Sequence, residues 1–149
     1  MTLGVDLVMR NEIDDVFCAV RPPGHHAERD RAMGFCFFNN VAVAAAHALE
    51  TYGLERIAIV DFDVHHGNGT EDIFRENEKV LFCSSFQHPF YPYTGADSSG
   101  PHIVNLPLAG GTDGAAFRQA VNRVDSREEQ LDMTYAFFEK LITREEMAA

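Results

Sequence analysis

Two aspartates and a histidine alternate with other residues where a central apolar run ends. The run RIAIVDF spans residues 56–62, and Asp61, Asp63 and His65 occupy every second position. Side chains of a strand alternate between its faces, so we expect all three to point the same way if the extended geometry persists. A carboxylate and an imidazole at this spacing can bind one divalent ion, and zinc accepts both ligand types. An Asp–His pair that caps a turn would have the same spacing, and Asp61 fits a partner of the ligands better than a ligand.

A second pair of histidines follows a stiff loop. His25 and His26 come directly after Pro-Pro-Gly at residues 22–24. Proline restricts the backbone and glycine permits a tight turn. Two imidazoles near one reacting centre could divide the work, one accepting a proton while the other stays charged or orients the first. Each needs an acceptor, and Asp61 and Asn68 are candidates, although a pair on the surface is the simpler explanation of the two histidines alone.

Aromatic residues lie in two further loops. Phe35 belongs to GFCFFNN, residues 34–40, and Tyr91 to FYPYTG, residues 90–95. Their rings could form the walls of a narrow slot for an extended aliphatic chain, because binding pockets are lined mostly by apolar and aromatic groups. Core packing explains such residues as well, and we expect it for Phe37 and Phe38.

Predicted strands and helices alternate along the chain. Asn39 or Asn40 can cap an alanine-rich helix that Gly53 can end in a left-handed turn. The expected helices span residues 39–53, 70–77, 114–124 and 133–149, after a helix end in the first eleven residues, and the expected strands span 16–20, 56–62, 79–85 and 102–108. We expect the strand at 56–62 to be covered on both faces. This order predicts an α/β domain with a mainly parallel sheet, in which ligands bind outside the carboxyl ends of the strands.

Composition limits the partners and the compartment. With 149 residues, 46% hydrophobic and 23% charged, the chain is long enough for one domain with a core. Its net charge of −11 argues against direct nucleic-acid binding and would tolerate a lysine-rich peptide. We identify no membrane span and no secretion signal. Cys18, Cys36 and Cys83 lack the spacing of a disulfide framework or a CxxC site, so we expect a reducing compartment, the cytoplasm.

Three motifs together resemble one family. RPPGHHA, GFCFFNN and DFDVHHGNGTEDIF are similar to the histone deacetylase superfamily, above all to its class II-type and bacterial members, the histone deacetylase-like amidohydrolases and acetoin-utilization proteins. The resemblance implies a three-layer arginase/deacetylase-like fold with a mainly parallel sheet, incomplete at this length. It also implies zinc-dependent hydrolysis of acetyl-lysine or a related acetyl-amide through a zinc-bound water. Acetylated lysine peptides and acetylpolyamines would be the substrates.

The resemblance implies two cation sites. Asp63 and His65 would be zinc ligands, and the family's third ligand is an aspartate in a Gly-Phe-Asp motif. This motif has no counterpart here, and Asp125 is the candidate for its place, although a solvated aspartate at a helix end explains Asp125 as well. Oxygens of five residues would match the family's inner potassium site: Asp61, Asp63, His65, Ser84 and Ser85.

The resemblance also assigns the proton transfer and the substrate channel. His26 would be the principal general base and acid, and His25, paired with Asp61, would give electrostatic support. Asn68 stands where many members have an aspartate, and an asparagine should leave His26 less basic than a carboxylate would. The channel would be formed by Gly34 at its mouth and by Phe35 and Tyr91 as its walls.

The chain also departs from the family pattern. The match covers about residues 5–120, which leaves 121–149 as a divergent helical tail of a single partial domain. The family's catalytic tyrosine follows Gly-Gly, whereas Gly110 and Gly111 precede Thr112. The alternative is therefore a truncated, inactive fragment that acts as a binding module, unless a second chain in a homo-oligomer completes the site. An arginase-type two-metal site would need an aspartate where Gly67 stands.

Overall fold

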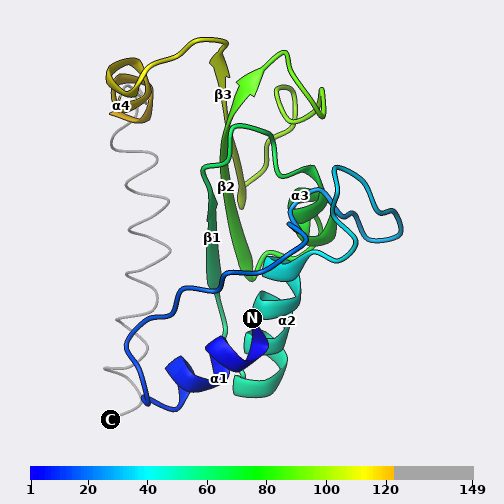
Figure 1. The fold of residues 1–149 in the computed structure, drawn as a ribbon, viewed down its shortest axis with the longest axis vertical. Helices are drawn as coiled ribbons and strands as arrows, with labels where there is room; N and C mark the ends of the chain where they lie inside the picture. Colours follow the sequence, from blue (N-terminus) through cyan, green and yellow to red (C-terminus); the bar gives the residue numbers. More distant parts are fainter. Residues whose placement is uncertain (123–149) are drawn as a thin grey trace. The chain divides into compact units, whose positions relative to one another are not determined.

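The computed structural model describes residues 1–122, which form a small set of helices and strands (Figure 1). In chain order the elements are α1 (Thr2–Met9), α2 (Asn40–Tyr52), β1 (Ile57–Asp61), α3 (Asn68–Phe74), β2 (Val80–His88), β3 (Ile103–Ala109) and α4 (Gly114–Asn122). Residues Met1–Gly110 form one compact unit, and α4 belongs to a second unit that begins at Gly111. Within the described range, every helix is too short or too polar to cross a membrane.

The strands form one parallel sheet in the order β1-β2-β3. Ile57 pairs with Val80 across β1 and β2, and Phe82 pairs with Ile103 across β2 and β3. Because the strands run in the same direction, their carboxyl ends meet at one edge of the sheet, and the loops that leave these ends begin side by side. A small α/β unit with a parallel sheet confirms the expected fold class.

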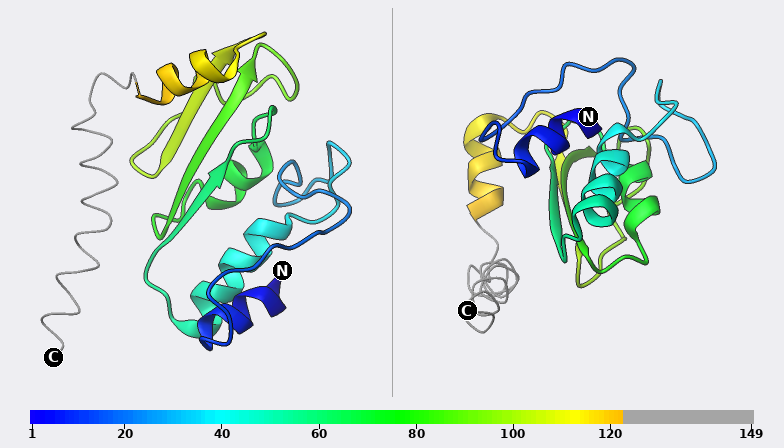
Figure 2. Two further views of the ribbon diagram at one scale, coloured as in Figure 1. Left: turned by 60° about the vertical axis from the view of Figure 1, so that its left-hand side comes forward. Right: turned by 90° about the horizontal axis from the view of Figure 1, so that it is seen from below.

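Helices α2 and α3 cover one face of the sheet (Figures 1 and 2). Asn39 caps α2 as predicted, because its side chain accepts a hydrogen bond from the Ala42 amide at 3.0 Å. Gly53 ends the helix in the left-handed conformation. Alanines let the helix approach the sheet closely, and the core between the layers consists of Ala42, Ala45, Ile59, Phe74, Val80, Phe82 and Ile103.

Three expectations about apolar segments are wrong. Residues 16–20 form no strand, and Phe17 is 92% exposed, because strand-forming residues need a neighbouring strand to bond with. Within Met1–Gly110, helices cover strand β1 on one face only, and Val60 on the other face is 67% exposed. Phe37 and Phe38 are exposed because they lie in a bend before α2 and not on the buried face of a helix or strand.

Candidate active site

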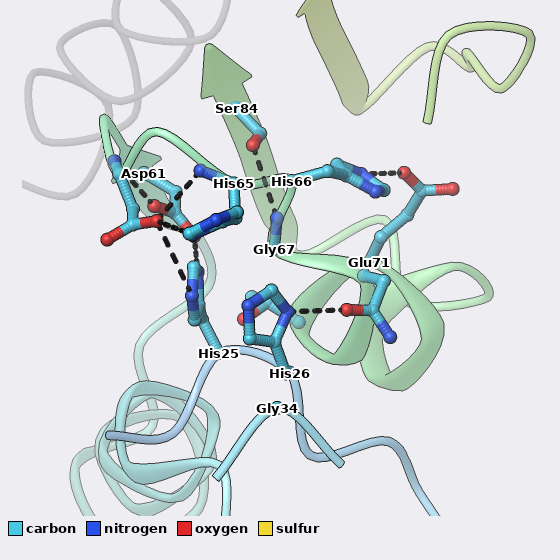
Figure 3. Close-up of polar contacts among 12 residues, drawn as sticks. His25, His26, Gly34, Asp61, His65, His66, Gly67, Glu71 and Ser84 are labelled. Carbon is cyan, nitrogen blue, oxygen red and sulfur yellow. Dashed lines mark hydrogen bonds and ion pairs between the residues drawn. The ribbon is translucent and has the colours of Figure 1, made fainter. Parts of the chain in front are cut away.

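The loop that carries His25 and His26 is fastened to the N-terminus of α3. The amides of Gly69 and Thr70 donate hydrogen bonds to the His25 carbonyl at 2.9 and 3.2 Å. Amides of a first helical turn have no acceptor within the helix, so an external carbonyl satisfies them. The histidine pair is thereby held beside the loop that follows β1 (Figure 3).

Two side-chain oxygens orient the histidine pair. His25 Nδ1 lies 2.8 Å from Asp61 Oδ2, and His26 Nδ1 lies 2.7 Å from Asn68 Oδ1. These are the two acceptors that the sequence suggested. The rings are tilted against each other, with centroids 4.0 Å apart. Since both Nδ1 atoms are engaged, Nε2 is the ring atom of His26 that is left for chemistry, whereas His25 Nε2 lies 3.9 Å from Asp63 Oδ1.

The pKa values of the two histidines move in opposite directions. Burial lowers the pKa of His25, but the hydrogen bond and the charge of Asp61 outweigh burial and raise that pKa above its usual value. Burial also lowers the pKa of His26, and the Asn68 hydrogen bond, which raises it, is opposed by the charges of His25 and His65. These shifts move His25 towards the charged form and His26 towards the neutral form, the directions that an electrostatic group and a proton acceptor require.

Asp63 and His65 meet in a turn and not along a strand. β1 ends at Asp61, so the extended geometry expected for these residues does not persist. Asp63 Oδ1 instead accepts a hydrogen bond from the His65 amide at 2.8 Å and lies 3.1 Å from His65 Nδ1. An aspartate that bonds to the backbone two residues later is a common turn former. The turn therefore brings the two candidate ligands together.

The donor set fits part of a zinc site. Two ligands about 2.0–2.1 Å from a tetrahedral zinc ion lie about 3.3 Å apart, and Asp63 Oδ1 is 3.1 Å from His65 Nδ1. Catalytic zinc sites have three protein ligands. Among residues 1–122 no three ligating side chains are arranged so that they could hold a metal ion, and Asp125 lies outside the described residues. The described residues therefore supply two suitable ligands.

Gly34 and Tyr91 contact the His26 ring. A Cβ atom on Gly34 would lie 2.3 Å from His26 Cδ2, and the φ angle of Gly34 is +56°, so a larger residue would displace the ring. Tyr91 meets His26 edge to face, with ring centroids 5.0 Å apart. Phe35 is 91% exposed on the same loop as Gly34. The structure thus places Gly34 and Tyr91 at His26 and leaves Phe35 projecting into solvent.

Candidate potassium ligands lie at the ends of β1 and β2. Asp61 and Ser84 are direct partners in the register of the two strands. Ser84 is buried, and its Oγ accepts a long hydrogen bond of 3.5 Å from the Gly67 amide (Figure 3). Ser85 is the next residue of β2, so its side chain points to the opposite face of the sheet. Potassium binding at these oxygens stays a prediction.

Known proteins show where this arrangement belongs. Residues 1–131 match the family described as the histone deacetylase domain. The chain belongs to this family. It is 47% identical over 123 residues to histone deacetylase 14, chloroplastic, of Arabidopsis thaliana, a match that covers 77% of this chain and 29% of the relative. It is 47% identical over 114 residues to polyamine deacetylase HDAC10 of Rattus norvegicus, covering 69% of this chain and 17% of the relative.

A solved structure of the same family has the same fold. The crystal structure of the HDA15 HD domain matches with a TM-score of 0.79 and 40% identity, over 91% of this chain and 40% of that chain. The chain thus spans less than half the length of each protein named here. The family assigned from the three motifs is confirmed.

Sequence reasoning missed a buried histidine in this deacetylase domain. His66 Nε2 lies 2.8 Å from Glu71 Oε2, and its Nδ1 lies 3.0 Å from Thr94 Oγ1. Glu71 also accepts hydrogen bonds from other side chains, and we call the whole set the inner network: His66, Glu71, Arg75, Thr94, Ser98 and Asn105. Burial raises the pKa of Glu71, but the hydrogen bonds of His66, Asn105 and Ser98 outweigh burial and lower it to about 2. The only sequence signal is an acidic residue in the first turn of α3, which does not reveal its burial.

Glu28 is a second carboxylate that sequence reasoning missed. Its Oε1 accepts a hydrogen bond from Asn68 Nδ2 at 2.7 Å, and its Oε2 lies 2.8 Å from an Arg31 guanidinium nitrogen. Glu28 therefore stands one hydrogen bond behind the His26–Asn68 pair. Glu28 and Asn68 are separated by 40 positions, so local spacing carried no signal of their contact.

Proposed function

We propose that this chain carries the proton-transfer histidines and two metal ligands of a zinc-dependent deacetylase. The observation that supports this most is the convergence of two histidines of opposite charge preference with an Asp–His pair at the carboxyl edge of a parallel sheet. The residues concerned form what we call the outer cluster: His25, His26, Asp61, Asp63 and His65. Membership of the histone deacetylase domain family supports the same reaction class.

His26 would move the protons of the hydrolysis. Its neutral ring, held at Nδ1 by Asn68, can take a proton at Nε2 from the water that attacks the acetyl carbonyl. When the amide C–N bond breaks, the same nitrogen gives this proton to the departing amine. The second proton of the water leaves the new acetic acid for the amine, so acetate and an ammonium group result. His25, charged and held by Asp61, would stabilise the negative charge that develops during the attack.

Asp63 and His65 would hold the zinc ion. Zinc, when bound, supplies Lewis-acid polarisation of the amide carbonyl and makes water a stronger nucleophile at neutral pH. The 3.1 Å between the two donor atoms supports this assignment. Asp125 is the candidate that the sequence offers for a third ligand.

The substrate would be an acetylated amine, either an acetyl-lysine peptide or an acetylpolyamine. The names of the two relatives, a histone deacetylase and a polyamine deacetylase, support both classes. An acetylpolyamine and a lysine-rich acetylated peptide both carry positive charge on their remaining amines, which suits a chain with a net charge of −11. The Tyr91 ring beside His26 offers an apolar surface for the aliphatic part of either substrate.

The test measures zinc content and deacetylation on the zinc-reconstituted chain. We expect about one zinc per chain, lost in Asp63→Ala and retained in Asp30→Ala, which removes an exposed aspartate. His26→Ala should keep the zinc and lower kcat by about 10²–10⁴ on an acetyl-lysine peptide or an N-acetylated polyamine, because the acid–base group is lost.

Each assignment has its own contrary result. Zinc content that Asp63→Ala leaves unchanged would contradict the metal assignment. Undiminished activity in His26→Ala would remove His26 from its role. A chain that binds zinc but cleaves neither substrate would favour the alternative, a non-catalytic binding module.

A further inference from the structure

Glu28 acts on His26 through the direction of two hydrogen bonds. We propose that Glu28, through the Asn68 amide, fixes His26 in the tautomer that carries its proton on Nδ1 and leaves Nε2 free. Glu28 is then a positioning residue for proton transfer. Its effect on catalysis rests on the proposed function, whereas its effect on the tautomer does not.

The contacts form one continuous line from the surface to the outer cluster. Arg31 lies 2.8 Å from Glu28 Oε2, and Glu28 Oε1 accepts from Asn68 Nδ2 at 2.7 Å. Asn68 Oδ1 lies 2.7 Å from His26 Nδ1. Asn68 and His26 are buried, and the Glu28 side chain is 21% exposed. Solvent therefore has little access to the two inner hydrogen bonds, and protein groups decide their direction.

An asparagine amide has a donor end and an acceptor end, and its partners decide which way it faces. The ionised Glu28 carboxylate can only accept, so it draws the NH₂ group of Asn68 towards itself. The Met33 sulfur, 3.3 Å from the same nitrogen, is also an acceptor. The amide oxygen is left facing His26 Nδ1, which must then carry the proton. A neutral imidazole has only one N–H, so Nε2 keeps its lone pair.

The neighbouring histidine shows why Glu28 is needed. His25 Nδ1 is bonded to Asp61, a carboxylate that can only accept, so Asp61 alone requires His25 to be the donor of this hydrogen bond. Asn68 alone could present either end to His26. The reversed amide would donate to Nδ1 and move the ring proton to Nε2, where the ring cannot accept a proton from water. A histidine held in the wrong tautomer has lost activity by about 10⁴ in a protease triad.

The direct test is the tautomer of His26 in the metal-free full chain. Long-range ¹H–¹⁵N NMR spectra, recorded at a pH where the ring is neutral, distinguish a protonated from an unprotonated ring nitrogen. The His26 signals are assigned by their loss in His26→Gln. We expect a single Nδ1–H tautomer in the parent chain, and about half or more of the Nε2–H form in Glu28→Gln, because glutamine can donate as well as accept. Glu76→Gln changes an exposed glutamate and should leave the tautomer unchanged.

A second variant separates direction from general damage. In Glu28→Gln/Asn68→Asp the carboxylate at position 68 accepts directly, so the Nδ1–H tautomer should return. An Nε2–H form in the parent chain, or a single Nδ1–H form in Glu28→Gln, would overturn the proposal. Where the chain deacetylates, Glu28→Gln should lower kcat at unchanged KM, with rescue in the double variant. Absence of zinc binding or turnover would count against the proposed function and leave the tautomer result standing.

Discussion

His65 and His66 are adjacent in the sequence and lie in opposite surroundings. The His65 side chain is 44% exposed and sits beside Asp63, whose side chain is 49% exposed. The His66 side chain is 2% exposed, and both of its ring nitrogens have side-chain partners, Thr94 and Glu71. The turn after β1 therefore sends one imidazole outwards and the next one into the interior.

The two histidines represent two kinds of polar region. In the inner network His66 and Glu71 are enclosed and bonded to each other, and hydrogen bonding of this kind is the condition under which a buried charge is tolerated. In the outer cluster the Nδ1 atoms of His25 and His26 are engaged by Asp61 and Asn68, while His26 Nε2 remains for a ligand or a proton. Polar groups whose hydrogen bonds are made within the protein stabilise the fold. A ring nitrogen without such a bond, at an open edge, can bind a ligand or transfer a proton.

The inner network also supports the outer cluster. Thr94, which contacts His66, belongs to the loop that carries Tyr91, and Tyr91 packs against both His26 and His65. Glu71 lies in α3, whose first amides hold the His25 carbonyl. The enclosed region thus fixes the two loops on which the open region depends.

We expect the largest difference between His65 and His66 in how much each side chain contributes to the free energy of unfolding. His66→Ala removes a buried hydrogen-bond partner of Glu71 and leaves a cavity where the ring was, so the free energy of unfolding should fall by about 3–5 kcal/mol. His65→Ala removes a half-exposed side chain and should change it by less than about 0.5 kcal/mol. Urea unfolding of both variants at pH 7 measures the difference. Equal losses in the two variants would abolish the distinction between the regions.

The inner network should also make stability depend on acid. The pKa of Glu71 is lowered from 4.5 to about 2, so its carboxyl group binds a proton more weakly in the folded chain than in the unfolded chain. A lowered pKa gives stability that is fully present above the unfolded value and is lost as the pH falls through the folded value. The loss should be about 3 kcal/mol between pH 4.5 and pH 2.

Urea unfolding of the parent chain and of Glu71→Gln across this pH range isolates the effect. The variant has no carboxyl group to titrate at position 71, so the difference in unfolding free energy between the two chains should shrink towards pH 2. A difference that stays constant over this range would show that Glu71 is not ionised in the folded state. Glu78→Gln, at an exposed position of the same segment, is the matched control.

The elements that local chemistry determines could be predicted from the sequence. The cap at Asn39, the alanines and Gly53 defined α2 to within one residue at each end. The alternation of strands and helices predicted a parallel sheet and brought the polar loops to one edge. Asp61 and Asn68, the candidate acceptors of His25 and His26, are the residues that the structure places beside these rings, at the end of β1 and at the start of α3.

Features that depend on distant partners could not be predicted. The segment at 16–20 has the composition of a strand, but hydrogen bonds to a neighbouring strand, which composition does not reveal, decide whether one forms. The hydrogen bond between Glu28 and Asn68 joins positions 40 residues apart. The burial of His66 depends on the turn after β1, which lies beyond the strand whose alternation can be read from the sequence.

Gly34 and Gly53 both have left-handed backbone conformations, and substituting each by alanine tests how tightly the outer cluster is packed. Gly34 has a φ angle of +56° and Gly53 one of +66°, so alanine costs about 1 kcal/mol of backbone strain at either. Only at Gly34 does the new Cβ also meet a neighbour, His26 Cδ2 at 2.3 Å, whereas nothing lies within 4 Å at Gly53. Gly34→Ala should therefore destabilise the chain by about 1–3 kcal/mol more than Gly53→Ala, because the His26 ring must move. Urea unfolding measures both losses, and the NMR signals of His26 should shift only in Gly34→Ala. Equal losses with an unmoved His26 would mean that the ring has free space beside it, and that the outer cluster is open on the Gly34 side as well as towards solvent.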